Sequence, residues 1–168
     1  KDLLWLANQG HNVIGVEISD IAINAFFGEN NLKYEKETNN GFDSYKAKNA
    51  SIAIYCGDYF KFNICGLDAL YDRGSLVAVE PSMRLKYIEH TKSLLHKLAY
   101  RFIISLDYEE GYVQGPPHPL KAAEVLSFWS DLKEVSSYND IANSSPRFKK
   151  SGLTELIESI WISKSTKY

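Results

Sequence analysis

Groups that can bind a small ligand follow three separate apolar runs of the sequence. Glu17 ends the first run, Asp58 and Tyr59 follow the second, and Arg73 follows the third. A carboxylate such as that of Glu17 can accept hydrogen bonds from both hydroxyls of a ribose, and Asp58 can accept one from an exocyclic amine such as that of adenine. Tyr59 can stack on the base. The plainer interpretations are a solvated acid, a turn residue and a local ion pair at a strand end.

The three apolar runs predict buried strands at Val13–Glu17, Ile52–Cys56 and Leu67–Asp72. The unbroken apolar residues of the first run are typical of a strand covered on both faces, as in a parallel sheet. Ser19 is placed to cap a helix after the first strand, and Pro81 suits the first turn of a later helix. Further strands are predicted at residues 101–108, 132–138 and 155–163, and a further helix at 120–128. The alternation predicts a mostly parallel sheet flanked by helices, at whose carboxyl edge the ligand-binding groups can converge.

The composition is that of an ordinary globular domain. The 168 residues carry a formal net charge of −2, so no basic field favours nucleic acid or an anionic membrane. The apolar runs are too short to span a bilayer. Cys56 and Cys65 form no C-x-x-C pair, which is typical of reduced thiols in the cytoplasm, and the four histidines show no metal-ligand spacing. We therefore expect one cytoplasmic domain over residues 1–168 that binds no metal, nucleic acid or membrane.

Several motifs, taken together, resemble the thiopurine S-methyltransferase family. They are WLANQGHNVIGVEIS at residues 5–19, YDRGSLVA at 71–78, GPP at 115–117 after Tyr108, and Arg147 ahead of GLTEL at 152–156. The resemblance runs in order over nearly the whole chain. It implies a Rossmann-like class I fold with a mostly parallel seven-stranded sheet and an antiparallel last strand. It also implies transfer of a methyl group from S-adenosylmethionine to an aromatic or heterocyclic thiol such as a thiopurine, with S-adenosylhomocysteine as product. Bacterial members are also linked with selenium and tellurium compounds.

Carried onto this chain, the resemblance assigns Glu17 to the ribose of the cofactor, and Asp58 and Tyr59 to its adenine. Arg73 would lie near both cofactor and acceptor, which makes it the catalytic candidate. Arginine stays protonated in proteins, so Arg73 cannot serve as a simple general base. Its charge would instead lower the pKa of the acceptor thiol and favour the thiolate, which is the better nucleophile.

The acceptor side is assigned to Arg147, Pro116 and Pro117. Proline fixes φ, so residues 115–119 form a stiff segment that can serve as a rigid pocket wall. The plainer interpretation is a surface connection. The expected partner is a small-molecule thiol, and we expect a monomer.

Members of the family begin several dozen residues earlier, with the first strand and a glycine-bearing loop under the methionine moiety. We therefore expect residues 1–168 to form a single domain that is N-terminally incomplete. Three alternatives stay open. A nicotinamide-dependent oxidoreductase also places an acid after its second strand, although its glycine fingerprint is not in this chain. The others are a thiol, halide or thiocyanate methyltransferase of the same fold, and a cofactor-binding remnant without activity.

Overall fold

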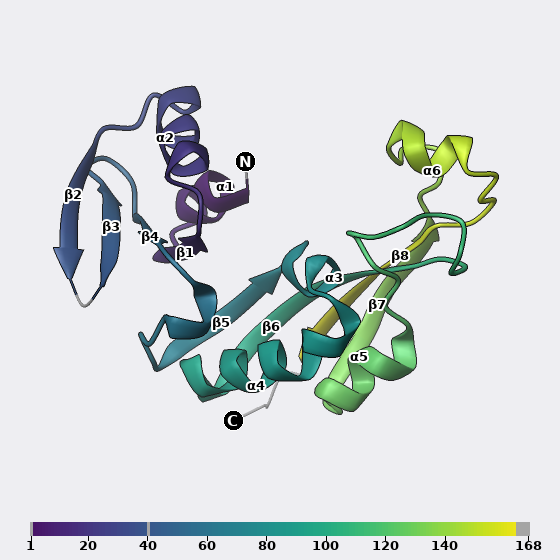
Figure 1. Ribbon diagram of the computed structural model, residues 1–168. Coiled ribbons are helices and arrows are strands. Elements are labelled where there is room, and N and C mark those ends of the chain that lie inside the picture. Colours follow the sequence, from purple (N-terminus) through teal and green to yellow (C-terminus); the bar gives the residue numbers. More distant parts are fainter. Residues whose placement is uncertain (1, 40, 164–168) are drawn as a thin grey trace. The chain divides into compact units, whose positions relative to one another are not determined.

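The computed structural model describes residues 2–39 and 41–163, and the chain divides into two compact units, Lys1–Asn63 and Ile64–Tyr168 (Figure 1). Each unit contains one four-stranded sheet with helices packed against it. Strands and helices alternate over most of the chain, as the sequence predicts for an α/β protein, but three strands follow one another between residues 34 and 56.

The sheet of the first unit has the strand order β1-β4-β3-β2. Its strands are β1 (Val13–Glu17), β2 (Tyr34–Asn39), β3 (Phe42–Ala47) and β4 (Ile52–Cys56), and its helices are α1 (Asp2–Asn8) and α2 (Asp20–Glu29). β1 and β4 are parallel, and their register pairs Val13 with Ile52 and Glu17 with Cys56. The carboxyl ends of the two strands are therefore level. Both strands have the bounds that the apolar runs predict.

Helix α2 is fixed by its cap and by two buried side chains. The Ser19 side chain accepts a hydrogen bond from the Ala22 amide at 3.2 Å, which satisfies one of the free donors of the first turn. Ile23 and Phe27 lie one turn apart and are almost fully buried, and they pack in the core of the first unit with Tyr45 of β3. This packing holds the helix directly behind the end of β1.

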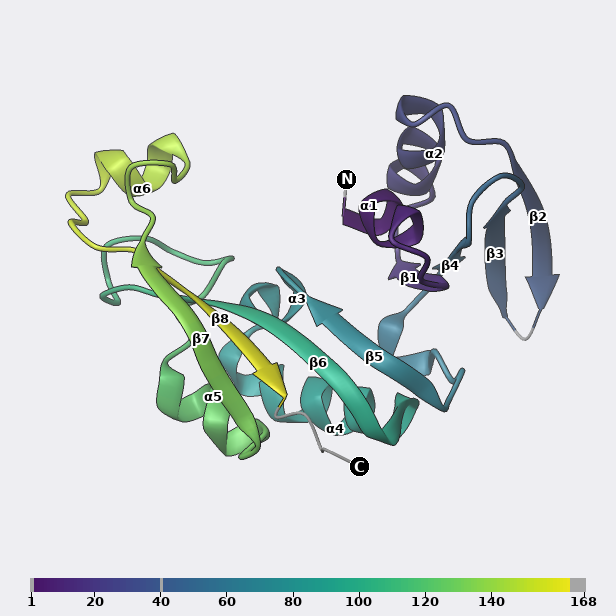
Figure 2. The same ribbon diagram turned by 180° about the vertical axis from the view of Figure 1, so that it is seen from behind.

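The sheet of the second unit has the strand order β5-β6-β8-β7. Its strands are β5 (Leu67–Asp72), β6 (Leu95–Asp107), β7 (Leu132–Asn139) and β8 (Ile157–Ser163). The helices are α3 (Ser75–Ala78), α4 (Arg84–Leu94), α5 (Ala122–Phe128) and α6 (Pro146–Lys150). Helices α3, α4 and α5 lie on one face of this sheet, in front in Figure 1 and behind in Figure 2.

The number and direction of the strands differ from the expected mostly parallel, seven-stranded sheet. Within the described residues, β1–β4 and β5–β6 are parallel pairs, whereas the other four pairs are antiparallel. Two antiparallel pairs arise because the polar segment after α2 forms the strands β2 and β3, which fold back onto β4. The other two arise because β8 runs opposite to both of its neighbours, β6 and β7, which confirms the predicted antiparallel last strand.

Candidate active site

Glu17 and Asp58 lie at neighbouring strand ends in the first unit. Because β1 and β4 are parallel and in register, Glu17 stands beside Cys56, two residues before Asp58. The Gly57 amide donates a hydrogen bond to the Glu17 carbonyl at 3.0 Å, so the pairing continues to the start of the turn. The two acids that the sequence predicts at one sheet edge are thus brought together.

Each acid is held by one oxygen through the main chain of its own turn. The Ser19 amide donates to Glu17 Oε1 at 2.9 Å, and the Phe60 amide donates to Asp58 Oδ1 at 2.9 Å. Within the described part of the chain, Glu17 Oε2 and Asp58 Oδ2 have no hydrogen-bond partner. An ionised carboxylate can accept about four hydrogen bonds. The arrangement therefore fits a ligand that presents hydroxyl and amine donors, as the ribose and adenine of S-adenosylmethionine do.

Tyr59 and Cys56 complete this edge. Tyr59 opens the 3₁₀ turn Tyr59–Lys61 directly after Asp58, and its ring lies 6.1 Å from that of Phe60 in an edge-to-face contact. Burial raises the pKa of the Cys56 thiol, so this side chain stays protonated at neutral pH and is not a nucleophile. The contact of Tyr59 with a nucleobase stays a prediction.

Gly57 is required in the turn that carries Asp58. A Cβ atom at this position would lie 2.5 Å from Phe42 Cε1, and the Phe42 ring is buried. We expect Gly57→Ala to lower the free energy of unfolding by about 1–3 kcal/mol, because the ring must shift in a packed core. Urea unfolding at matched protein concentration measures this effect.

Gly28→Ala is the matched control for Gly57→Ala. A Cβ atom on Gly28 in α2 meets nothing within 4 Å, so alanine there is expected to stabilise the helix by up to about 1 kcal/mol. Equal stability of the two variants would mean that the Phe42 contact imposes no constraint.

Arg73 lies within a turn of the second unit that Asp72 fixes. Asp72 is almost fully buried, and its Oδ1 accepts hydrogen bonds from the amides of residues 74–76 at 3.0–3.3 Å. Its Oδ2 accepts a hydrogen bond from the Tyr87 hydroxyl at 2.8 Å. Asp72 thus ties the end of β5 to the first turn of α3 and sets the place of Arg73 between them.

Arg147 and the proline loop, residues 115–119, are in contact within the second unit. Arg147 Nη2 donates a hydrogen bond to the Pro116 carbonyl, and its guanidinium lies 5.1 Å over the Phe148 ring. The Tyr108 hydroxyl donates to the Pro117 carbonyl at 2.7 Å. The three residues assigned to the acceptor side are therefore brought together, and Arg147 braces the loop through its backbone.

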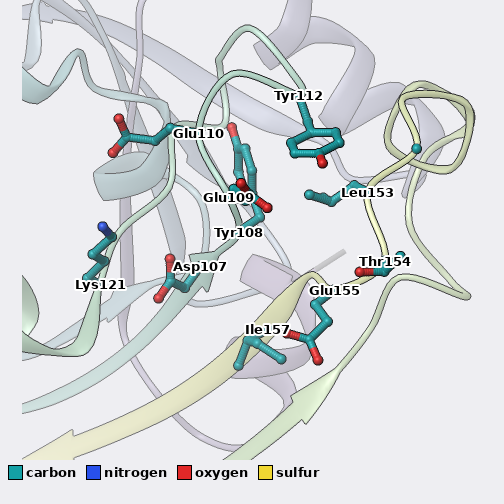
Figure 3. A pocket seen from close by; sticks show the side chains of 11 residues that line it. Asp107, Tyr108, Glu109, Glu110, Tyr112, Lys121, Leu153, Thr154, Glu155 and Ile157 are labelled. Atoms are coloured by element: carbon teal, nitrogen blue, oxygen red, sulfur yellow. The ribbon is translucent and has the colours of Figure 1, made fainter.

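A cavity of about 530 Å³ opens beside the carboxyl end of β6 (Figure 3). Its lining consists of Asp107, Tyr108, Glu109, Glu110, Tyr112, Lys121, Gly152, Leu153, Thr154, Glu155 and Ile157. This volume is within the range of small-molecule sites. In Figure 3, Asp107, Glu110 and Lys121 line one side and Leu153, Thr154 and Glu155 the other. With four carboxylates and one lysine, the lining disfavours an anion and suits a neutral ring with N–H donors.

Tyr108 connects the cavity with the proline loop, because it lines the former and bonds to the latter. Burial is the main cause that raises the pKa of its phenol, so Tyr108 remains a neutral donor to Pro117 at physiological pH. The sequence motif contains Tyr108, but only the structure reveals both contacts.

Comparison with known proteins shows the family of this chain. The family model described as thiopurine S-methyltransferase (TPMT) matches residues 1–166. A thiopurine S-methyltransferase of Pseudomonas fluorescens (strain Pf0-1) is 35% identical over 165 residues, which cover 95% of this chain and 75% of the relative. A thiopurine S-methyltransferase of Nitrosospira multiformis is 34% identical over 168 residues, which cover 96% of this chain and 75% of the relative. The chain belongs to the thiopurine S-methyltransferase family. The predicted family and the predicted class of enzyme, a methyltransferase, are confirmed.

Solved structures agree with a class I methyltransferase fold. TehB from Haemophilus influenzae matches with a TM-score of 0.61 at 12% identity, over 96% of this chain and 53% of that protein. A second match is the 1,6-didemethyltoxoflavin-N1-methyltransferase of Burkholderia thailandensis, solved with bound 1,6-didemethyltoxoflavin and S-adenosylhomocysteine. Its TM-score is 0.58 at 14% identity, over 98% of this chain and 67% of that protein. At such identities the likeness concerns the fold alone, and it confirms the predicted Rossmann-like methyltransferase class.

The residues that the sequence assigns to the site of this protein fall into two sets. Glu17, Asp58 and Tyr59 lie in the first unit, and Arg73, Arg147, Pro116 and Pro117 lie in the second. Convergence of the two sets on one ligand stays a prediction. Over the described ranges, no helix is long and apolar enough to cross a membrane, and no group of three or more potential ligands is arranged to hold a metal ion.

Proposed function

We propose that this protein transfers the methyl group of S-adenosylmethionine to the sulfur of an aromatic or heterocyclic thiol, with thiopurines as the acceptor class. The observation that carries the proposal is the pair of level acids, Glu17 and Asp58, each with one oxygen open to a ligand, in a chain of this family. Two donors on a ribose and one on adenine match these open oxygens.

The cofactor would be held by Glu17 at its ribose and by Asp58 at its adenine amine, with Tyr59 beside the base and Arg73 near its reactive end. When bound, S-adenosylmethionine supplies an electrophilic methyl group on a positively charged sulfur. Because the main-chain amides of Ser19 and Phe60 already fix one oxygen of each acid, the other oxygens are oriented before a ligand arrives.

On the acceptor side, Arg73 would favour the thiolate by its charge, and water would carry the proton away. The proline loop, braced by Arg147, would form a wall of the acceptor site. The cavity beside Tyr108 is suited to the ring of a thiopurine, because its carboxylates can accept hydrogen bonds from ring N–H groups. Its negative lining makes it unsuited to the thiolate sulfur itself.

We further propose that the two units belong to one methyltransferase domain. The support is the family model, whose match runs through both units from residue 1 to residue 166. The N-terminal incompleteness of this domain, its monomeric state and its cytoplasmic location stay predictions.

A methyl-transfer assay tests the proposed function. The purified protein is incubated with labelled S-adenosylmethionine and, in separate reactions, a thiopurine, a thiophenol, selenite, iodide and thiocyanate. We expect label in the methylated thiopurine and thiophenol. Label only in methyl iodide or methyl thiocyanate would favour the halide or thiocyanate alternative.

A thermal-shift experiment separates the remaining alternatives. S-adenosylhomocysteine should raise the melting temperature and NAD should leave it unchanged, because a ligand stabilises only the state that binds it. Stabilisation by S-adenosylhomocysteine without transfer to any acceptor would favour a cofactor-binding remnant. Stabilisation by NAD alone would overturn the proposal.

A further inference from the structure

Four successive carbonyl groups of the proline loop, those of residues 116–119, accept hydrogen bonds from side chains that lie elsewhere in the second unit. Arg147 donates to Pro116, Tyr108 to Pro117 at 2.7 Å, and Arg84 Nη2 to His118 at 3.3 Å and to Pro119 at 3.0 Å. Three of these four residues are prolines, which have no N–H to donate. The loop therefore depends on these side chains for its place.

Arg84 is the most buried of the three donors. It is 2% exposed at the start of α4, and its Nη1 donates to both carboxylate oxygens of Glu124 in α5, at 3.0 and 2.9 Å. Burying a guanidinium is costly unless its charge is paired and most of its donors are used. Of the Arg84 nitrogens, Nε has no partner among the described residues. Glu124 supplies the countercharge, and the loop carbonyls take Nη2. One side chain thus joins two helices to the proline loop.

We propose that Arg84 is a positioning residue for the methyl acceptor: it holds the proline loop, and through the loop the wall against which the acceptor rests. This inference rests on the proposed function. Tyr108 is the route by which loop movement would reach the ligand, because it bonds to Pro117 and also lines the cavity.

Arg84→Lys tests the inference, since lysine keeps the charge but lacks the planar fork that serves Glu124 and two carbonyls at once. We expect KM for a thiophenol acceptor to rise about 10-fold or more, the factor that corresponds to losing one charged hydrogen bond. The dissociation constant of S-adenosylhomocysteine should stay within about two-fold, because the hydrogen bonds of Arg84 go to Glu124 and the proline loop and not to the residues assigned to the cofactor.

A readout that needs no turnover accompanies the kinetics. The His118 amide donates to the Val77 carbonyl at 2.6 Å, and its hydrogen exchange reports whether the loop is held. We expect this amide to exchange at least about 10-fold faster in Arg84→Lys than in the wild-type protein.

Arg101→Lys is the matched control. Arg101 in β6 is also largely buried and is paired with Asp131, and within the described residues no hydrogen bond or ion pair joins it to the proline loop. It should lower the melting temperature to a similar extent and leave both the acceptor KM and the exchange of His118 unchanged. If Arg84→Lys does not fold, Glu124→Gln replaces it, because this change weakens the Arg84 anchor without adding bulk, and the same two effects are expected at a smaller size.

The outcomes decide between the inference and a structural role. A wild-type acceptor KM in Arg84→Lys, or the same change in Arg101→Lys, would overturn the inference. Failure of the wild-type protein to methylate any thiol would overturn the proposed function instead. In that case unchanged His118 exchange overturns the role of Arg84 in holding the loop, and faster exchange upholds it.

Discussion

Replacing Arg73 by alanine is expected to lower kcat for thiol methylation by about 100- to 1,000-fold, the effect typical of removing one stabilising group from a reacting charge. The turn that carries Arg73 is set by Asp72, whose four hydrogen bonds involve backbone amides and Tyr87. The fold should therefore survive the change, and the loss should fall on chemistry. Turnover at saturating S-adenosylmethionine measures it, with circular dichroism as the check on folding.

The pH dependence distinguishes this role from simple binding. A guanidinium beside the acceptor lowers the pKa of the thiol, so its removal leaves more of the acceptor protonated at neutral pH. Raising the pH ionises the thiol without help, and the deficit of Arg73→Ala should shrink accordingly. Arg73→Lys keeps the charge and should be intermediate.

Lys97→Ala is the matched control for Arg73→Ala. It removes one exposed positive charge near the amino end of the neighbouring strand β6 and should leave kcat unchanged. Near-normal turnover in both Arg73 variants would remove this residue from the mechanism.

Glu17→Ala is expected to weaken the binding of S-adenosylhomocysteine by about 100-fold. Each hydrogen bond to a charged acceptor contributes about 1.5–3 kcal/mol, and two ribose hydroxyls would lose their partner. Glu17 is half-buried, and within the described residues its carboxylate is bonded through the Ser19 amide alone, so the loss of this side chain should cost little stability. Titration calorimetry with S-adenosylhomocysteine measures the change.

Ser19→Ala is the control for the local structure. It removes the hydroxyl that caps α2, at a cost of about 0.5–2 kcal/mol of stability, and it keeps the amide that holds Glu17. Its affinity for S-adenosylhomocysteine should match that of the wild-type protein. An affinity within two-fold of wild type in Glu17→Ala would exclude the assigned role.

The strands that carry candidate site residues were predictable, because each is a short apolar run that ends at a glycine or an acid. β1, β4 and β5 have the bounds that these runs predict. Strand β2 was not predictable, because its sequence YEKETN has no apolar periodicity. It pairs with β3 through charges, including Lys36 with Asp43 at 2.8 Å and Lys46 with Glu37 at 2.6 Å.

The side chains that support the site could not be predicted from the sequence either. Arg84 meets the proline loop from 34 and 35 residues away, and no spacing rule connects such positions. Asp72 did carry a signal, since an acid followed by glycine and serine before an apolar pair is typical of a helix start. Its burial and its bond to Tyr87 follow only from the packing of α4.

Because the bend after β5 owes its shape to Asp72, the identity of residue 73 can change without rebuilding the backbone around it. Such a position is open to evolution. If Arg73 acts on the acceptor as proposed, an exchange of this side chain for histidine or glutamine, in evolution or by design, would favour acceptors of different acidity while the surrounding backbone stays the same.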